Sequence, residues 1–107
     1  DFGARKDNSS FLVFGFDGDD TITANEGNDH LYGGDGDDVI TGGFGNDFIH
    51  GGNGDDSIFA GPRNSIGSAG AADNDWIDGE DGNDFIEGGV GDDTILGGDG
   101  TDEIYGD

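Results

Sequence analysis

An aspartate recurs every nine residues along almost the whole chain, and this spacing limits the possible folds more than any other feature. The spacing is broken once, between Asp56 and Asp75, where it is 19 residues. Two residues after each aspartate the sequence has isoleucine or leucine. Repetition at a fixed period indicates an architecture in which successive copies stack on one another. The repeated aspartates are Asp20, Asp29, Asp38, Asp47, Asp56, Asp75, Asp84, Asp93 and Asp102.

Glycine marks the expected turn in each copy, and the unit reads G-G-x-G-x-D-x-U-x, where U is aliphatic. Nine copies span residues 15–105. Glycine accepts the positive φ angles and the close backbone approach of a tight turn. The x-U-x triplet predicts a short strand whose middle residue points away from its two neighbours, so the U residues face a common interior. The turn glycines, two residues before the aspartates, are Gly18, Gly27, Gly36, Gly45, Gly54, Gly82, Gly91 and Gly100.

The composition predicts that this chain needs a metal to fold. It has 26 acidic and three basic residues, a net charge of −23, 30% hydrophobic residues and no cysteine. Such a charge disfavours nucleic acid and anionic membranes as partners, and no apolar run reaches the roughly 18 residues of a membrane helix. Low hydrophobicity with high charge is typical of disorder, and disulfides cannot compensate here. Carboxylate and carbonyl oxygens suit Ca²⁺.

The repeat resembles the RTX family, the "repeats in toxin" modules of secreted bacterial proteins. The copies that match best are residues 33–41 and 42–50. The resemblance implies an all-β fold, a right-handed parallel β-roll (β-solenoid) with two repeats per coil. Alternate repeats then form two stacks, and calcium lies between neighbouring loops of a stack. The repeated aspartates and the turn glycines named above are the metal-site residues that it implies, for about seven calcium ions.

One domain is expected, with a tail or linker before it. Residues 1–10 are the tail, and residues 11–107 form a single β-roll. Within the roll, residues 11–14 are an apolar half-coil that caps the first edge, and residues 15–59 and 75–105 are repeats. Residues 60–74 hold the start of a repeat with ten inserted residues, which we expect to be a surface loop, either tolerated or used for docking. Asp73 replaces the turn glycine there, which puts the adjoining sites in question.

The leading functional prediction is calcium binding coupled to folding. In low calcium the carboxylates repel one another and the chain stays open, as passage through an exporter requires; in extracellular calcium it folds. The resemblance implies a secreted protein of the Gram-negative type I route: a toxin, protease, lipase or adhesin. We expect this chain to be a fragment of such a protein, with other domains as partners. No nucleophile or zinc-protease motif is present, so we expect no enzyme within these residues.

Two other functions are compatible with the sequence. The first is a structural or adhesive scaffold that spaces domains or self-associates into filaments. The second is glycan binding through an outward aromatic face that includes Tyr32, Phe48 and Trp76. A zinc site at His30 and His50 lacks a third ligand.

Overall fold

The computed structural model describes residues 10–24, 26–61 and 73–106. These residues form ten β-strands and contain no helix, so none of them forms a helix that could cross a membrane. The strands are β1 (Leu12–Phe14), β2 (Thr21–Thr23), β3 (His30–Asp35), β4 (Val39–Thr41), β5 (Phe48–Asn53), β6 (Ser57–Phe59), β7 (Trp76–Asp81), β8 (Phe85–Glu87), β9 (Thr94–Leu96) and β10 (Glu103–Tyr105).

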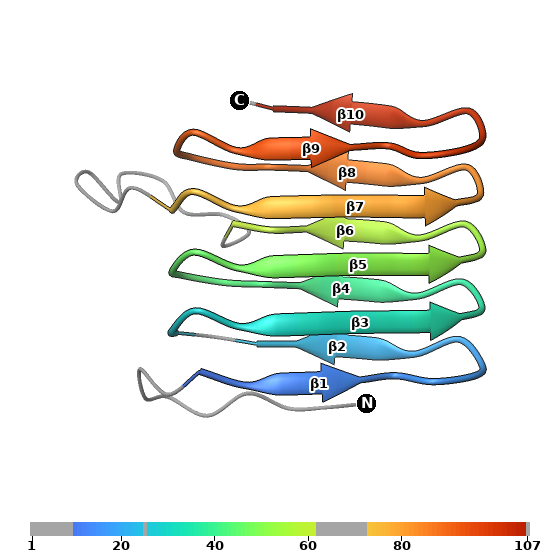
Figure 1. The fold of residues 1–107 in the computed structure, drawn as a ribbon, viewed down its shortest axis with the longest axis horizontal. Helices are drawn as coiled ribbons and strands as arrows, with labels where there is room; N and C mark the ends of the chain where they lie inside the picture. Colours follow the sequence, from blue (N-terminus) through green and yellow to red (C-terminus); the bar gives the residue numbers. More distant parts are fainter. Residues whose placement is uncertain (1–9, 25, 62–72, 107) are drawn as a thin grey trace.

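The strands alternate between two parallel sheets. One sheet has the order β1-β3-β5-β7-β9 and the other β10-β8-β6-β4-β2. Each coil therefore contributes one strand to each sheet, and the coils stack along the molecule (Figure 1). Val13 pairs with Leu31, 18 residues later, whereas Ile49 pairs with Ile77 because the insertion lies between them. The parallel β-roll that the family resemblance implies is confirmed.

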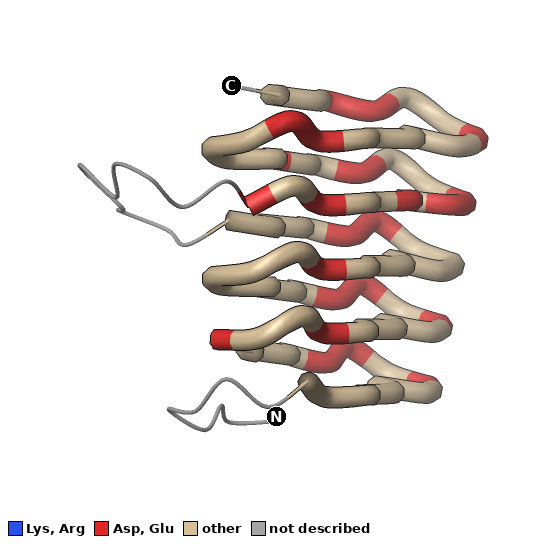
Figure 2. The backbone as a smooth tube through the Cα atoms, turned by 60° about the vertical axis from the view of Figure 1, so that its left-hand side comes forward, with Lys and Arg blue, Asp and Glu red and all other residues tan. Residues whose placement is uncertain are grey.

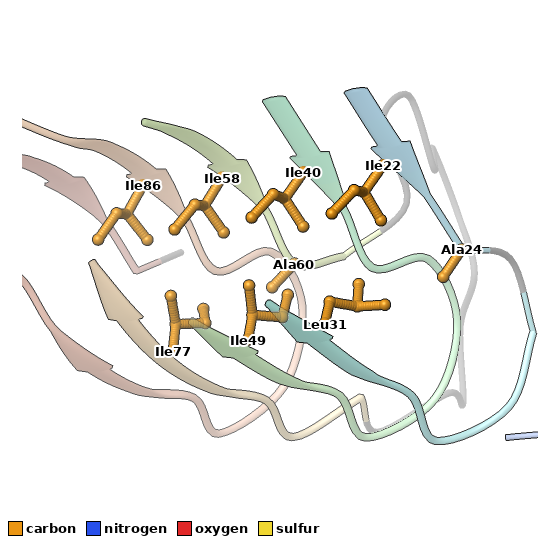
Figure 3. Packing of buried hydrophobic residues seen from close by; sticks show 9 residues of the cluster. All are labelled: Ile22, Ala24, Leu31, Ile40, Ile49, Ile58, Ala60, Ile77 and Ile86. Atoms are coloured by element: carbon orange, nitrogen blue, oxygen red, sulfur yellow. The ribbon is translucent and has the colours of Figure 1, made fainter. Parts of the chain in front are cut away.

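The core is a double column of the U residues. Ile22, Leu31, Ile40, Ile49, Ile58, Ile77 and Ile86 are each at most 1% exposed. Those of the β2–β4–β6–β8 strands face those of β3, β5 and β7 across the roll (Figure 3). Each of the three inner coils thus buries two U residues, and Ala24 and Ala60 of the loops add to the cluster. A core this narrow leaves much of the stability to be supplied by the loops.

The loops form two stacks at opposite edges of the roll (Figure 1). The first loop stack comprises residues 15–20, 33–38, 51–56, 79–84 and 97–102. The second loop stack comprises residues 24–29, 42–47, 60–75 and 88–93, of which residues 25 and 62–72 lie outside the described part. All the predicted metal-site residues belong to these two stacks.

Residues next to the insertion keep the register of the roll. Ala60 donates its amide to the carbonyl of Glu87, and Trp76 donates to the carbonyl of Asp47. The expected surface loop and docking site at residues 62–72 lie outside the described residues, as does the tail at residues 1–9. Directly after this tail, the predicted half-coil contains β1, which pairs with β3.

Candidate metal sites in the loop stacks

The repeated aspartates end their loops and point inward beneath them. Asp29, Asp38, Asp47, Asp56, Asp75 and Asp84 are at most 2% exposed. Asp20, Asp93 and Asp102, near the ends of the roll, are partly exposed. The local reason is the pattern of the repeat. The U residue, two positions after each aspartate, points into the core, and side chains two positions apart in an extended chain point to the same side. The aspartates of one stack therefore lie in a column, one per coil (Figure 2).

One carboxylate oxygen of each buried aspartate is fixed by the coil before it. The amide of Asp38 donates to Oδ1 of Asp56 at 2.8 Å, and the amide of Asp47 donates to Oδ1 of Asp75 at 2.8 Å. The same bond recurs in every gap between neighbouring loops: Asp20 to Asp38, Asp29 to Asp47, Asp56 to Asp84, Asp75 to Asp93 and Asp84 to Asp102. Phe11 makes it to Asp29 from the capping half-coil.

The second oxygen of these aspartates has no hydrogen-bond donor. Oδ2 is buried without a partner, among the described residues, in Asp20, Asp29, Asp38, Asp47, Asp56, Asp73, Asp75, Asp84 and Asp93. Burying an ionised oxygen without a partner is costly unless a cation neutralises it. A column of such oxygens fits a row of hard cations.

Backbone carbonyls reach the same space. A Cβ built on Gly33 would lie 2.5 Å from the carbonyl oxygen of Gly51 and 2.6 Å from Oδ2 of Asp38. At Gly15, the corresponding atoms are the carbonyl oxygen of Gly33 at 2.5 Å and Oδ2 of Asp20 at 2.7 Å. The missing side chain thus lets a carboxylate oxygen of the same loop and a carbonyl oxygen of the next coil come together closer to the glycine than any side chain would allow. The residues present fit Ca²⁺, which takes six to eight such oxygens.

These first glycines of the repeat were missed by the sequence reasoning, which selected the turn glycines. Gly36 and Gly54, for example, have φ angles of 111° and 118°, and their role is to turn the chain. The G-G doublet could have revealed them. Only its second glycine has a positive φ, so the first must be glycine for another reason. No three histidine or acidic side chains of the described residues gather around one point, so a calcium site here would take its further oxygens from the backbone or from water.

The electrostatics of the aspartate columns are unfavourable without a cation. Burial raises the pKa of Asp47 and of Asp56 to about 8. Burial likewise raises the pKa of Asp75 to about 7 and that of Asp84 to about 6. The hydrogen bond that each carboxylate accepts from a backbone amide lowers its pKa in part, whereas neighbouring aspartates raise the pKa further. Both burial and mutual repulsion thus oppose ionisation.

The residues beside the insertion make the same hydrogen bonds between coils as the other copies of the repeat. Asp75 accepts the amide of Asp47, and Asn74 donates its amide to Oδ1 of Asn46 at 2.8 Å. Asp73, which stands where other copies have the turn glycine, is 4% exposed, and its Oδ1 accepts the amide of Gly45 at 3.3 Å. The loop therefore returns to register within the three residues that follow the undescribed segment.

The aromatic face lies on the sheet that contains β1, β3, β5, β7 and β9. Its rings form two rows along the roll, with centroid separations of 4.5–5.3 Å and interplanar angles of 6–26° within a row. The rings therefore cover one another's faces. A sugar stacks on a free ring face, so this arrangement disfavours the glycan-binding alternative. The rows are Phe14–Tyr32–His50 and His30–Phe48–Trp76.

The two histidines fall in different rows. His50 shares a hydrogen bond with Glu80, Nδ1 to Oε2 at 2.9 Å, and His30 stacks on Phe48. The structure thus gives each histidine a partner other than a metal.

Comparison with known proteins agrees with the geometry. A family model described as the RTX calcium-binding nonapeptide repeat (4 copies) matches residues 14–49, 37–62 and 69–104, well over half of the chain. No match was found among curated proteins or among solved structures.

Proposed function

Because this chain belongs to the RTX calcium-binding nonapeptide repeat family, we propose that it is the calcium-triggered folding module of a secreted bacterial protein. The observation that carries the proposal is the set of buried Oδ2 atoms without donors, one in nearly every loop. A calcium-binding module of RTX proteins needs such oxygens. Calcium-triggered folding follows if the protein cannot bury them without the ion.

The metal-free chain has little reason to fold. Even the inner coils bury only two U residues each, and each new coil brings two more aspartate carboxylates next to those already buried. Calcium, when bound, supplies the positive charge that compensates the carboxylates. The free energy of binding is then also free energy of folding.

We assign one calcium ion to each gap between neighbouring loops. The first loop stack has four gaps and the second has three. In each gap the backbone amide of one repeated aspartate donates a hydrogen bond to the carboxylate of the next. The repeated aspartates and the carbonyls of the glycine-rich loops would hold the ions, about seven in all. Each ion orders a loop that the next ion uses, so binding is expected to be cooperative.

The proposed setting is extracellular. A low calcium concentration inside the cell keeps the carboxylates repelling one another, and a high concentration outside lets the coils form in sequence. This behaviour suits type I secretion from a Gram-negative cell, with a toxin, protease, lipase or adhesin as the parent protein. The module itself would be non-catalytic and would stabilise the other domains of that parent chain.

The proposal is tested by far-UV circular dichroism during a calcium titration, with magnesium as the control ion. We expect a sharp change from coil to β-structure with calcium, with a Hill slope above one. Magnesium should not replace calcium, because it demands a stricter octahedral geometry. A full β spectrum already present in metal-free buffer, or a Hill slope of one, would contradict calcium-triggered folding.

Light scattering on the same samples separates this function from that of a scaffold. A folding module stays monomeric when calcium is added, whereas a filament former grows in mass. Growth in mass with calcium would favour the scaffold.

A further inference from the structure

The residue just before each repeated aspartate, the fifth of the repeat, joins neighbouring loops without a metal. Its side-chain oxygen accepts the amide of the equivalent residue one coil later, at 2.7–2.9 Å. One such bond spans every gap. The acceptors are Asp19, Asp37, Asp55 and Asn83 in the first loop stack, and Asn28, Asn46 and Asn74 in the second.

These bonds run opposite to those of the repeated aspartates. In one gap the amide of Asp38 donates forward to Asp56, while the amide of Asp55 donates back to Asp37. The forward bond ends on a buried carboxylate that needs a cation. The backward bond ends on a solvent-exposed side chain and needs none.

The two loop stacks differ in charge at this position. The second stack has only asparagine acceptors, whereas three of the four acceptors in the first stack are aspartates. The outer tips of the first stack are also acidic, on the right of Figure 2, whereas those of the second are largely neutral. The tip residues of the first stack are Asp17, Asp35, Asn53, Asp81 and Asp99.

The difference in charge has opposite consequences in the two states of the protein. Equivalent residues of successive coils are about 4.8 Å apart, so a row of carboxylates repels itself when no cation is near. The same carboxylates attract a cation bound close by. A row of asparagines makes the same hydrogen bonds without either effect.

We infer that the fifth residue sets how far each loop stack depends on calcium. Asn28, Asn46 and Asn74 join the loops of the second stack without adding to its need for calcium. Asp19, Asp37 and Asp55 open the first stack in the absence of calcium and strengthen calcium binding once it folds. This inference rests on the proposed calcium-triggered folding and assigns its control to residues that are not themselves the predicted ligands.

Two matched triple variants test it, D19N/D37N/D55N and N28D/N46D/N74D. Metal-free protein is folded with the osmolyte trimethylamine N-oxide, which favours burial, and circular dichroism gives the concentration needed. The Asp→Asn triple should fold at a lower osmolyte concentration than the unmodified protein, and the Asn→Asp triple at a higher one.

Calcium affinity is then measured calorimetrically on the osmolyte-folded proteins. A variant that is more stable without metal should bind calcium more weakly, and a less stable one more tightly. The Asp→Asn triple should bind calcium about three- to tenfold more weakly at the sites of the first stack, and the Asn→Asp triple correspondingly more tightly at those of the second. A purely structural role of these residues would not produce this opposition.

Two controls separate position and hydrogen bonding from charge. D17N/D81N/D99N removes the same charge from the tips of the same stack, at three carboxylates that do not accept the next loop's backbone amide, and should change both quantities less than D19N/D37N/D55N. Asp35 is left unchanged because it accepts the side-chain amide of Asn53 in the next loop. N28A/N46A/N74A removes the acceptor without a change in charge, and should raise the osmolyte requirement while leaving calcium affinity as it was.

Equal effects of the tip control and D19N/D37N/D55N would overturn the inference, as would stability and affinity moving in the same direction. Absence of calcium binding by the unmodified protein would instead remove the proposed function itself, so the two failures are distinct.

Discussion

Phe16 and Glu80 occupy a backbone conformation that glycine adopts in other copies of the repeat. Both have φ of 71°, whereas Gly34, Gly52 and Gly98 at the same position have φ of 96°, 99° and 88°. A residue with a Cβ is strained there by about 1–2 kcal/mol. Glu80 gains a hydrogen bond to His50 in return, and Phe16 stacks on Phe14 at 5.8 Å.

We predict that Phe16→Gly is more stable than Phe16→Ala, by about 1 kcal/mol. Both variants lose the ring, but only alanine keeps the strained backbone. Urea unfolding in saturating calcium measures the difference. The same pair at the exposed strand residue Thr23 is the control, and there alanine should be the more stable. Equal stability of the two Phe16 variants would show that the backbone is not strained.

Each strand of the roll has one aliphatic side chain at the U position, and the burial of that side chain depends on the neighbouring strands. Ile49 of β5 lies between Leu31 of β3 and Ile77 of β7 and is fully buried. Ile104 of β10, the last described strand of its sheet, pairs on one side only and is 44% exposed. The same residue type at the same repeat position is therefore expected to contribute very differently.

Ile49→Ala should destabilise the calcium-loaded protein by about 2–5 kcal/mol, because it leaves a cavity between packed coils. Ile104→Ala should cost less than about 1 kcal/mol, as for an exposed site. Thermal or urea unfolding monitored by circular dichroism gives both values. Similar losses at the two positions would mean that β10 is covered in solution.

The stability of the whole molecule must depend on pH, because several of its carboxylates are buried and have raised pKa values. Burial raises the pKa of Asp47 and Asp56 to about 8 and that of Asp75 to about 7. The ordinary value is 3.8, so between these limits the folded metal-free chain binds more protons than the unfolded chain. Its stability is therefore fully present below about pH 4 and is lost progressively as the pH rises from there to about 8.

Acidification should consequently replace calcium in part. In metal-free buffer we expect β-structure to increase as the pH falls from 8 to 5, as followed by circular dichroism. Calcium should release protons when it binds near pH 7, which calorimetry in buffers of different ionisation enthalpy detects. A metal-free β signal that grows with rising pH, or calcium binding without proton release, would contradict this reading.

The sequence by itself determined the strands, the core and the loop aspartates, because these follow from local rules. A nine-residue period with a glycine turn and a U residue between two outward residues leaves one arrangement of strand and interior, and the family match agrees with it. The predicted ligand set and the number of ions stay predictions.

Only the tertiary structure decided which atoms meet between coils. These contacts join residues 18 or 28 positions apart. They are the hydrogen bonds to Oδ1 that leave Oδ2 without a donor, the approach of the Gly51 carbonyl to Gly33, the hydrogen bonds of the fifth residue and the stacking of the aromatic rings. A local pattern states which side of a strand a residue occupies. It does not state how far one coil is shifted over the next, and that shift fixes every one of these contacts.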